Sequence, residues 1–146
     1  MSSLTERLRT AYRLPSRERW LTVRVLAGLV VARAGLAVFG FPRLRRIVER
    51  TRARRHEDPQ FAAELRRALV RAARTVPGAT CLLQAIVAAR LLRAAGLPAA
   101  LTIGVARPGA GAAGLEAHAW VHSGDVVVAG DADLSRYQEI ARFGAP

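Results

Sequence analysis

The sequence predicts a single α+β domain, with amino-terminal helices followed by a cysteine-bearing helix packed on a small antiparallel sheet. Helical patterns fill the chain up to Gly96, and short β-branched segments bounded by glycine and proline follow. The chain has 146 residues, 51% of them hydrophobic, and can bury a core of its own. We therefore expect one domain over residues 1–146, with a helical part at 1–76 and the cysteine helix and sheet at 77–146.

Charge and cysteine content narrow the class of protein. The formal net charge of +12 comes from 23 basic residues, all arginine, and 11 acidic ones, which predicts an acidic partner. We expect no nucleic acid among the partners, because zinc-ligand spacing, recognition motifs and stacking aromatics are lacking. No cofactor or metal is expected. The single cysteine and the lack of a signal peptide favour a cytoplasmic location.

The stretch from Trp20 to Phe41 is strongly apolar, which raises the question of a membrane span. Arg24 and Arg33 interrupt it, and charges are costly in the middle of a bilayer. We interpret the stretch as a helix that is buried in the protein or lies against a partner or a membrane surface. Phe41-Pro42 then predicts a break, after which a basic amphipathic helix begins at Arg43.

A second basic segment leads into the next helix. The run from Arg50 to Arg55 is interpreted as a solvated face, with His56 exposed at its end. Asp58-Pro59 combines an N-cap with proline at the first helical position, and the helix is expected to reach Arg74. Its apolar side is formed by Phe61, Leu65, Ala68, Leu69 and Ala72.

The stretch from Thr80 to Gly96 carries the only cysteine of the chain. Thr80 is a good N-cap, and Gly96 followed by Pro98 ends the helix. Cys81 then lies in the first turn, where free N–H groups and the positive end of the helix dipole stabilise a thiolate. The alternative interpretation of a lone cysteine is a small, inert core residue.

Three short strands are predicted after this helix, at Ala100–Ala106, Glu116–His122 and Val126–Asp131. The glycine-rich stretch from Arg107 to Gly114 is a loop. Gly124-Asp125 suits a two-residue type II′ turn, whose first residue needs a positive φ.

This turn predicts the pairing of the last two strands. If Ser123 pairs with Val126, counting outward places His118 directly opposite Asp131, with Cβ atoms ~4.5–5.5 Å apart. A carboxylate so placed can orient the imidazole, and Asp133 is a diagonal neighbour. A slip by one residue would put the two side chains on opposite faces.

Together these residues predict a nucleophile, a base and an orienting group. The Cys81 thiolate would attack a carbonyl, His118 would relay the proton, and Asp131 would hold the imidazole. First-turn amides of the cysteine helix could bind the oxyanion. His122, on the same strand face as His118, is expected to be exposed. The alternative interpretation of the hairpin is a salt-bridged surface feature.

A resemblance to a known family rests on short motifs spread over nearly the whole chain. They are Cys81-Leu82, Gly96-Leu97-Pro98, Ile103-Gly104-Val105, His118-Ala119-Trp120-Val121 and Gly130 to Tyr137 (GDADLSRY), with Pro15 to Trp20 before them. This pattern resembles the transglutaminase-like cysteine-protease superfamily, with its transglutaminase/papain-like core. More narrowly, it is similar to the stand-alone leader peptidase of lasso-peptide biosynthesis.

The resemblance implies a cysteine peptidase that removes the leader from a ribosomally made precursor, with Cys81, His118 and Asp131 as catalytic residues. It also implies a catalytic core at 77–146. The implied partners are the precursor peptide, a separate leader-recognition protein and, further along, the ATP-dependent macrolactam cyclase.

Two other functions remain open on the sequence. The same triad serves a transglutaminase or an amide-forming acyltransferase, because hydrolysis and acyl transfer share one thioester. A non-catalytic basic binding module, with the arginine-rich helices as its working face, is the alternative of another class. Membrane-surface contact is compatible with the composition but is not predicted.

Overall fold

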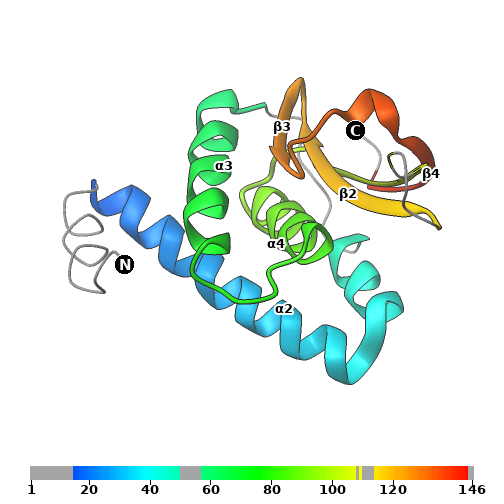
Figure 1. Ribbon diagram of the computed structural model, residues 1–146. Helices are drawn as coiled ribbons and strands as arrows, with labels where there is room; N and C mark the ends of the chain where they lie inside the picture. Colours follow the sequence, from blue (N-terminus) through cyan, green and yellow to red (C-terminus); the bar gives the residue numbers. More distant parts are fainter. Residues whose placement is uncertain (1–14, 50–56, 108, 110–113, 145–146) are drawn as a thin grey trace.

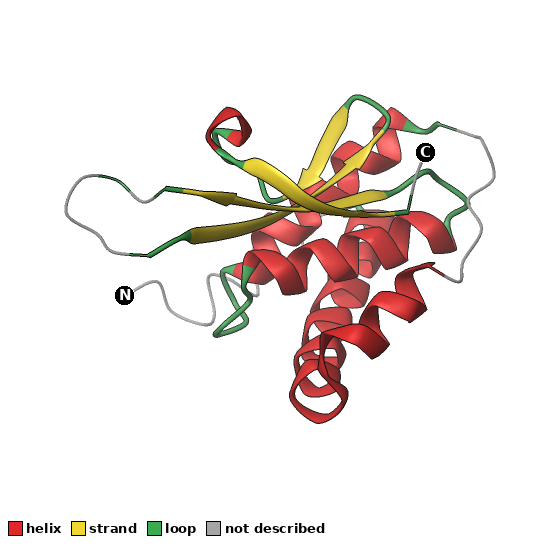
Figure 2. Cartoon of the chain, turned by 90° about the vertical axis from the view of Figure 1, so that its right-hand side faces the viewer, coloured by secondary structure: helices red, strands yellow, loops and turns green. Residues whose placement is uncertain are grey.

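The computed structural model describes residues 15–49, 57–107, 109 and 114–144. Within this part of the chain, three α-helices lie on one face of a four-stranded antiparallel sheet (Figures 1 and 2). The predicted α+β class is confirmed. The basic run at 50–55 and His56 lie outside the described residues, so their predicted exposure stays a prediction.

Helix α2 (Ser16–Glu49) is the longest element and lies along the outer edge of the molecule (Figure 1). Its inner side packs on α3 and α4 through Leu21, Val25 and Leu29, which are almost fully buried. The predicted break is confirmed, but it falls at Gly40 (φ 70°, ψ 172°) and not at the phenylalanine and proline that follow. Gly40 absorbs the kink because a residue without Cβ tolerates this backbone conformation.

Helices α3 (Pro59–Ala73) and α4 (Cys81–Ala94) begin at the predicted caps. The Asp58 carboxylate accepts a hydrogen bond from the Phe61 amide at 2.9 Å, with proline in the first turn. At the other end of α4, Gly96 takes φ +79° and the Leu97 amide donates to the Leu92 carbonyl at 2.9 Å. This is a Schellman ending, which satisfies carbonyls that the helix leaves unpaired.

Helix α4 lies between α2 and the sheet, and nearly all of its circumference is buried (Figure 1). The close approach of α2 depends on Gly28, because a Cβ there would stand 2.9 Å from the Val87 Cγ1 atom. The absence of strongly polar residues along most of α4 is therefore explained by its central position. The core that fixes its amino end is shared by helices and sheet.

The sheet has the strand order β3-β2-β1-β4. Its strands are β1 (Ala100–Ala106), β2 (Glu116–Ser123), β3 (Val126–Ala129) and β4 (Gln138–Phe143). The first two match the prediction to within one residue. Strand β3 ends two residues earlier than predicted, and β4 was not predicted at all. Strand β4 lies at the sheet edge and is mostly exposed, so its sequence lacks the apolar signal of a buried strand.

The pairing of β2 with β3 corrects the predicted register. Ser123 does pair with Val126, as the turn at Gly124 (φ +56°) predicts, and His122 pairs with Val127. The register then shifts, so that Val121 pairs with Ala129. This bulge adds one residue to β3, and the prediction that His118 lies directly opposite Asp131 is wrong. A local turn signal cannot reveal a bulge further along the hairpin.

Candidate active site

Cys81 is the first residue of α4, as the sequence predicts. The Thr80 hydroxyl accepts a hydrogen bond from the Leu83 amide at 3.4 Å, and the first helical bond runs from the Gln84 amide to the Thr80 carbonyl at 3.0 Å. The amides of Cys81 and Leu82 precede that bond, so a ligand at the helix end could use them. The thiol is half-buried against the core. This combination of partial exposure and a helix amino end suits a nucleophile.

His118 is fixed by the backbone that follows β3. Its Nε2 atom lies 3.0 Å from the Gly130 carbonyl oxygen. A carbonyl only accepts hydrogen bonds, so Nε2 carries the hydrogen and Nδ1 is left with its lone pair. A histidine held in this tautomer can take up a proton through Nδ1. The base therefore receives its orientation from a main-chain oxygen.

Gly130 is the residue that makes this contact sterically feasible. Its φ is +76°, and a Cβ there would stand 2.2 Å from the Ala119 carbonyl oxygen and 2.7 Å from the Trp120 Cα atom. Any side chain would force the two backbone segments apart. The glycine that precedes Asp131 in the sequence is thus explained by its close approach to β2.

Two aromatic rings flank the imidazole. The ring centroids of His118 and Trp120 are 6.2 Å apart in a stacked arrangement, and those of His118 and Tyr137 are 5.1 Å apart. Trp120 is buried over Gly104, where a Cβ would come within 2.7 Å of the indole. The Trp120 and Tyr137 rings therefore limit the orientations that the His118 imidazole can adopt.

Tyr137 is held in turn by Glu116, to which its hydroxyl donates at 2.6 Å. This hydrogen bond raises the pKa of Tyr137 above its ordinary value, with help from burial and from the carboxylate charge. The charge of the Cys81 thiolate also raises the pKa of Tyr137, which places the thiol and the phenol in one electrostatic neighbourhood. Tyr137 therefore lies beside the histidine ring and within range of the charge on Cys81.

Cys81 and His118 are not directly bonded. Both residues are described, and no hydrogen bond between them occurs in the structure. Alternation along β2 directs Ala119 and Val121 into the core, and His118 and Trp120 to the other side of the strand. Catalytic hydrogen bonds are often long before substrate binds, so this does not exclude the pair as a nucleophile and a base. His122 is half-buried, so the prediction that it is exposed is wrong.

The two candidate orienting carboxylates both contact other groups. The Asp131 carboxylate is paired with Arg66 of α3, and both side chains are largely exposed. The Asp133 carboxylate accepts a hydrogen bond from the Ser135 hydroxyl at 2.5 Å. Neither carboxylate bonds His118, whose partner is the carbonyl of the residue before Asp131.

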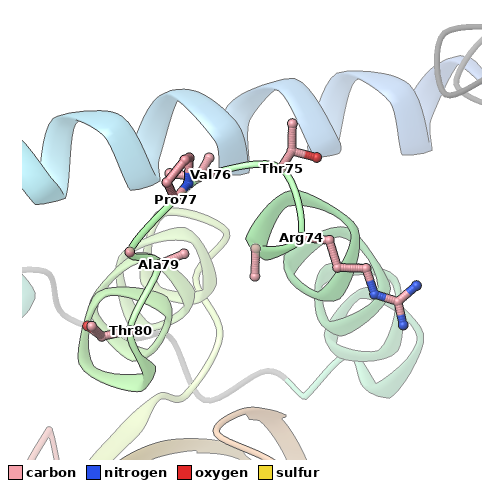
Figure 3. Close-up of a pocket in the computed structure, with 8 residues that line it drawn as sticks. Arg74, Thr75, Val76, Pro77, Ala79 and Thr80 are labelled. Atoms are coloured by element: carbon pink, nitrogen blue, oxygen red, sulfur yellow. The ribbon is translucent and has the colours of Figure 1, made fainter. Parts of the chain in front are cut away.

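An open pocket of about 500 Å³ adjoins the start of α4 (Figure 3). Residues 73–80, which join α3 to α4, form its lining. Thr80 lies at one end of this lining, directly before the cysteine. No cluster of three or more histidine, cysteine or acidic residues suited to a metal occurs among the described residues.

Several site residues were not singled out from the sequence. They are Arg66, Glu116 and Tyr137, and they act on the site through tertiary contacts. Tyr137 does fall inside the GDADLSRY segment, so the family resemblance held the only signal for it. Glu116 and Arg66 had none, because exposed charges on strands and helices are common.

Comparison with models of protein families identifies the superfamily of the chain. The profile described as "Transglutaminase-like superfamily" matches residues 26–142, from within α2 to the end of the sheet. The chain therefore belongs to the transglutaminase-like superfamily, which is associated with cysteine-protease and acyltransferase activities. The comparison with curated proteins gave no match, and neither did the comparison with solved structures.

Proposed function

We propose that this protein is a cysteine peptidase that removes the leader peptide from a lasso-peptide precursor. The observations that carry the proposal are the half-buried Cys81 at the amino end of α4 and His118, whose Nε2 is held by the Gly130 carbonyl. Membership of the transglutaminase-like superfamily supports thioester chemistry. The choice of a lasso-peptide precursor rests on the sequence motifs alone.

The proposed reaction has two stages. His118 first takes the thiol proton of Cys81 at Nδ1. The thiolate then attacks the carbonyl carbon of the scissile peptide bond, and the C–N bond breaks as His118 passes that proton to the departing amine. A thioester to the leader remains. Water then attacks this thioester, His118 accepts the proton of the water, and the thiolate leaves. The amides of the first turn of α4 are suited to stabilise the oxyanion in both stages.

The group that orients the histidine is a backbone carbonyl in this proposal, and not a carboxylate. The Gly130 carbonyl holds Nε2, which leaves Nδ1 for the proton transfers. Asp131 is the proposed positioning residue: its ion pair with Arg66 anchors the segment that carries this carbonyl. The role is weaker than that of a carboxylate bonded to the imidazole.

The proposed partners are the precursor, a leader-recognition protein and the macrolactam cyclase. The open pocket at residues 73–80 is a candidate binding site for the peptide, because its lining includes Thr80, the residue directly before the cysteine. The excess of arginine over acidic residues suits an acidic leader or an acidic partner surface. A cytoplasmic location is part of the same proposal.

The experiment is a precursor cleavage assay with the recognition protein present. Cys81→Ala should abolish cleavage and leave the fold intact, with Cys81→Ser as a second test of the thiol. Mass spectrometry of the wild type should show a transient leader thioester. Retained cleavage by a folded Cys81→Ala protein would end the peptidase proposal.

The superfamily match favours one second candidate, transfer of the acyl group to an amine. The same assay separates the two reactions when a primary amine is added. Hydrolysis gives a free leader carboxylate, whereas a transglutaminase or amide-forming acyltransferase gives the leader amide. Slow alkylation of Cys81 by iodoacetamide near neutral pH, with no turnover, would instead indicate a binding module with an inert cysteine.

A further inference from the structure

The outward side of α2 is apolar along most of its length. Every exposed residue from Trp20 to Phe39 is apolar except Arg33. Large side chains dominate, and six of them are more than half exposed: Trp20, Val23, Val30, Val31, Val38 and Phe39. We call these six residues the α2 outer face. A contiguous exposed apolar face of this kind normally marks a binding surface, so we expect it to be covered.

The charge around the α2 outer face is of one sign. Residues 19–48 contain six arginines and no aspartate or glutamate. The Arg24 guanidinium lies 4.6 Å from the centroid of the Trp20 ring, and the Arg43 guanidinium lies 5.3 Å from that of Phe39. The face is thus bounded at both ends by an aromatic ring under an arginine. Apolar burial rimmed by arginine, with aromatics at the boundary, is the pattern of a helix that lies in a membrane interface.

A span across the bilayer does not fit this helix. Ser16–Arg43 is long and apolar enough to cross a membrane. Its inner side, however, packs on α3 and α4 through fully or almost fully buried residues such as Val25 and Leu29. Those contacts would have to break before lipid could surround the helix. Only the outer side is available, over a length of ~28 Å from Trp20 to Phe39 at 1.5 Å per residue.

A second copy of the chain is a poorer cover. Two such faces in contact would bring two sets of arginines together, and like charges across an interface oppose association. An anionic lipid surface supplies the opposite charge together with an apolar layer. The face also lies along a single helix at the outer edge of the molecule (Figure 1), and four of its six residues are valines, which are under-represented among the residues that anchor protein partners.

We propose that the α2 outer face binds the surface of an anionic membrane, with the valines in the acyl boundary and the arginines at the headgroups. In this arrangement the α2 helix lies parallel to the membrane plane, and the lipid-binding site is separate from Cys81. The inference does not depend on the peptidase proposal, because lipid binding is measured without any peptide.

The test is vesicle flotation of the full chain. Vesicles in which phosphatidylglycerol replaces a third of the phosphatidylcholine should carry the protein, and pure phosphatidylcholine should carry much less. Binding should fall as salt shortens the Debye length from ~10 Å at 0.1 M to ~3 Å at 1 M. Trp20, 61% exposed, should give a blue-shifted emission on binding, and Trp20→Phe should remove the shift.

A matched pair of variants tests the location. Val31 and Val38 are 69% and 71% exposed, so Val31→Glu with Val38→Glu leaves the core untouched. This variant should bind the vesicles at least about tenfold more weakly, since two valines that the membrane would bury are replaced by charged residues. The control is Leu115→Glu with Ile140→Glu, at positions that are 69% and 61% exposed and lie outside α2, just before β2 and in β4. The control should bind as the wild type does, and circular dichroism should show that both variants are folded.

Three results would overturn the inference. The first is a wild type that does not float with anionic vesicles, or floats equally with neutral ones. The second is unchanged binding by the α2 variant. The third is a wild-type dimer in light scattering that the α2 variant converts to a monomer, which would assign the face to a second copy of the chain.

Discussion

Replacing Asp131 by asparagine tests how His118 is oriented. In the structure the carboxylate meets Arg66, and the imidazole meets the Gly130 carbonyl. The substitution removes one ion pair whose side chains are 43% and 64% exposed. Exposed pairs contribute about 0–1 kcal/mol, so even if the whole amount entered the barrier, the rate would fall by at most about fivefold. A carboxylate bonded directly to the imidazole would be worth about 10⁴ in rate, as in serine-protease triads.

The assay is single-turnover cleavage of the precursor by wild type, Asp131→Asn, Arg66→Gln and the double variant. Because the two side chains act as one pair, the double variant should be no slower than either single one. Asp133→Asn is the control, since the hydrogen bond of that carboxylate among the described residues is to Ser135 in its own turn. We expect it to retain wild-type activity.

A substitution that disturbs the backbone carbonyl, and leaves the carboxylate in place, strengthens the test. Gly130→Ala places a Cβ 2.2 Å from the Ala119 carbonyl oxygen and displaces the acceptor of the histidine hydrogen bond. A misplacement of this size can cost about 10²-fold in rate. Nitrogen chemical shifts of the imidazole should show the Nε2–H tautomer in the wild type and its loss in the variant. A drop of 10³ or more for Asp131→Asn, with unchanged tautomer for Gly130→Ala, would refute the assignment of orientation to the backbone.

Two further predictions concern the phenol beside the site and the cap of α3. The pKa of Tyr137 is raised by the hydrogen bond to Glu116, so the bond adds stability below the ordinary tyrosine pKa of 10.0, and this is lost as the pH rises through the raised value. Glu116→Gln should lower the pKa of Tyr137, measured by tyrosinate absorbance against a Tyr137→Phe baseline; an unchanged curve would contradict the assigned contact. Asp58→Ala removes the carboxylate that caps α3 at 2.9 Å and should lower the free energy of unfolding by about 1 kcal/mol in urea melts. Equal stability would show that the α3 end is held by packing alone.

The sequence alone determined the local features of this protein. Caps at Asp58 and Thr80, the stop at Gly96 and the turn at Gly124 are each decided by the residue type and its immediate neighbours. For this reason the start and end of α4, and the placement of Cys81 in its first turn, could be predicted. The family could also be inferred from the sequence, because its motifs are short runs of residues whose types are set by local structure.

Tertiary structure alone decided the partners of these groups. The bulge in β3 moves Asp131 out of line with His118 and puts the Gly130 carbonyl on the imidazole. The Asp131 carboxylate instead forms an ion pair with Arg66 of α3. Strand β4, an exposed edge without a strong apolar pattern, forms because β1 offers it free hydrogen-bonding groups. Each of these contacts joins residues distant in the chain, and their energies depend on packing that no local pattern of residues expresses.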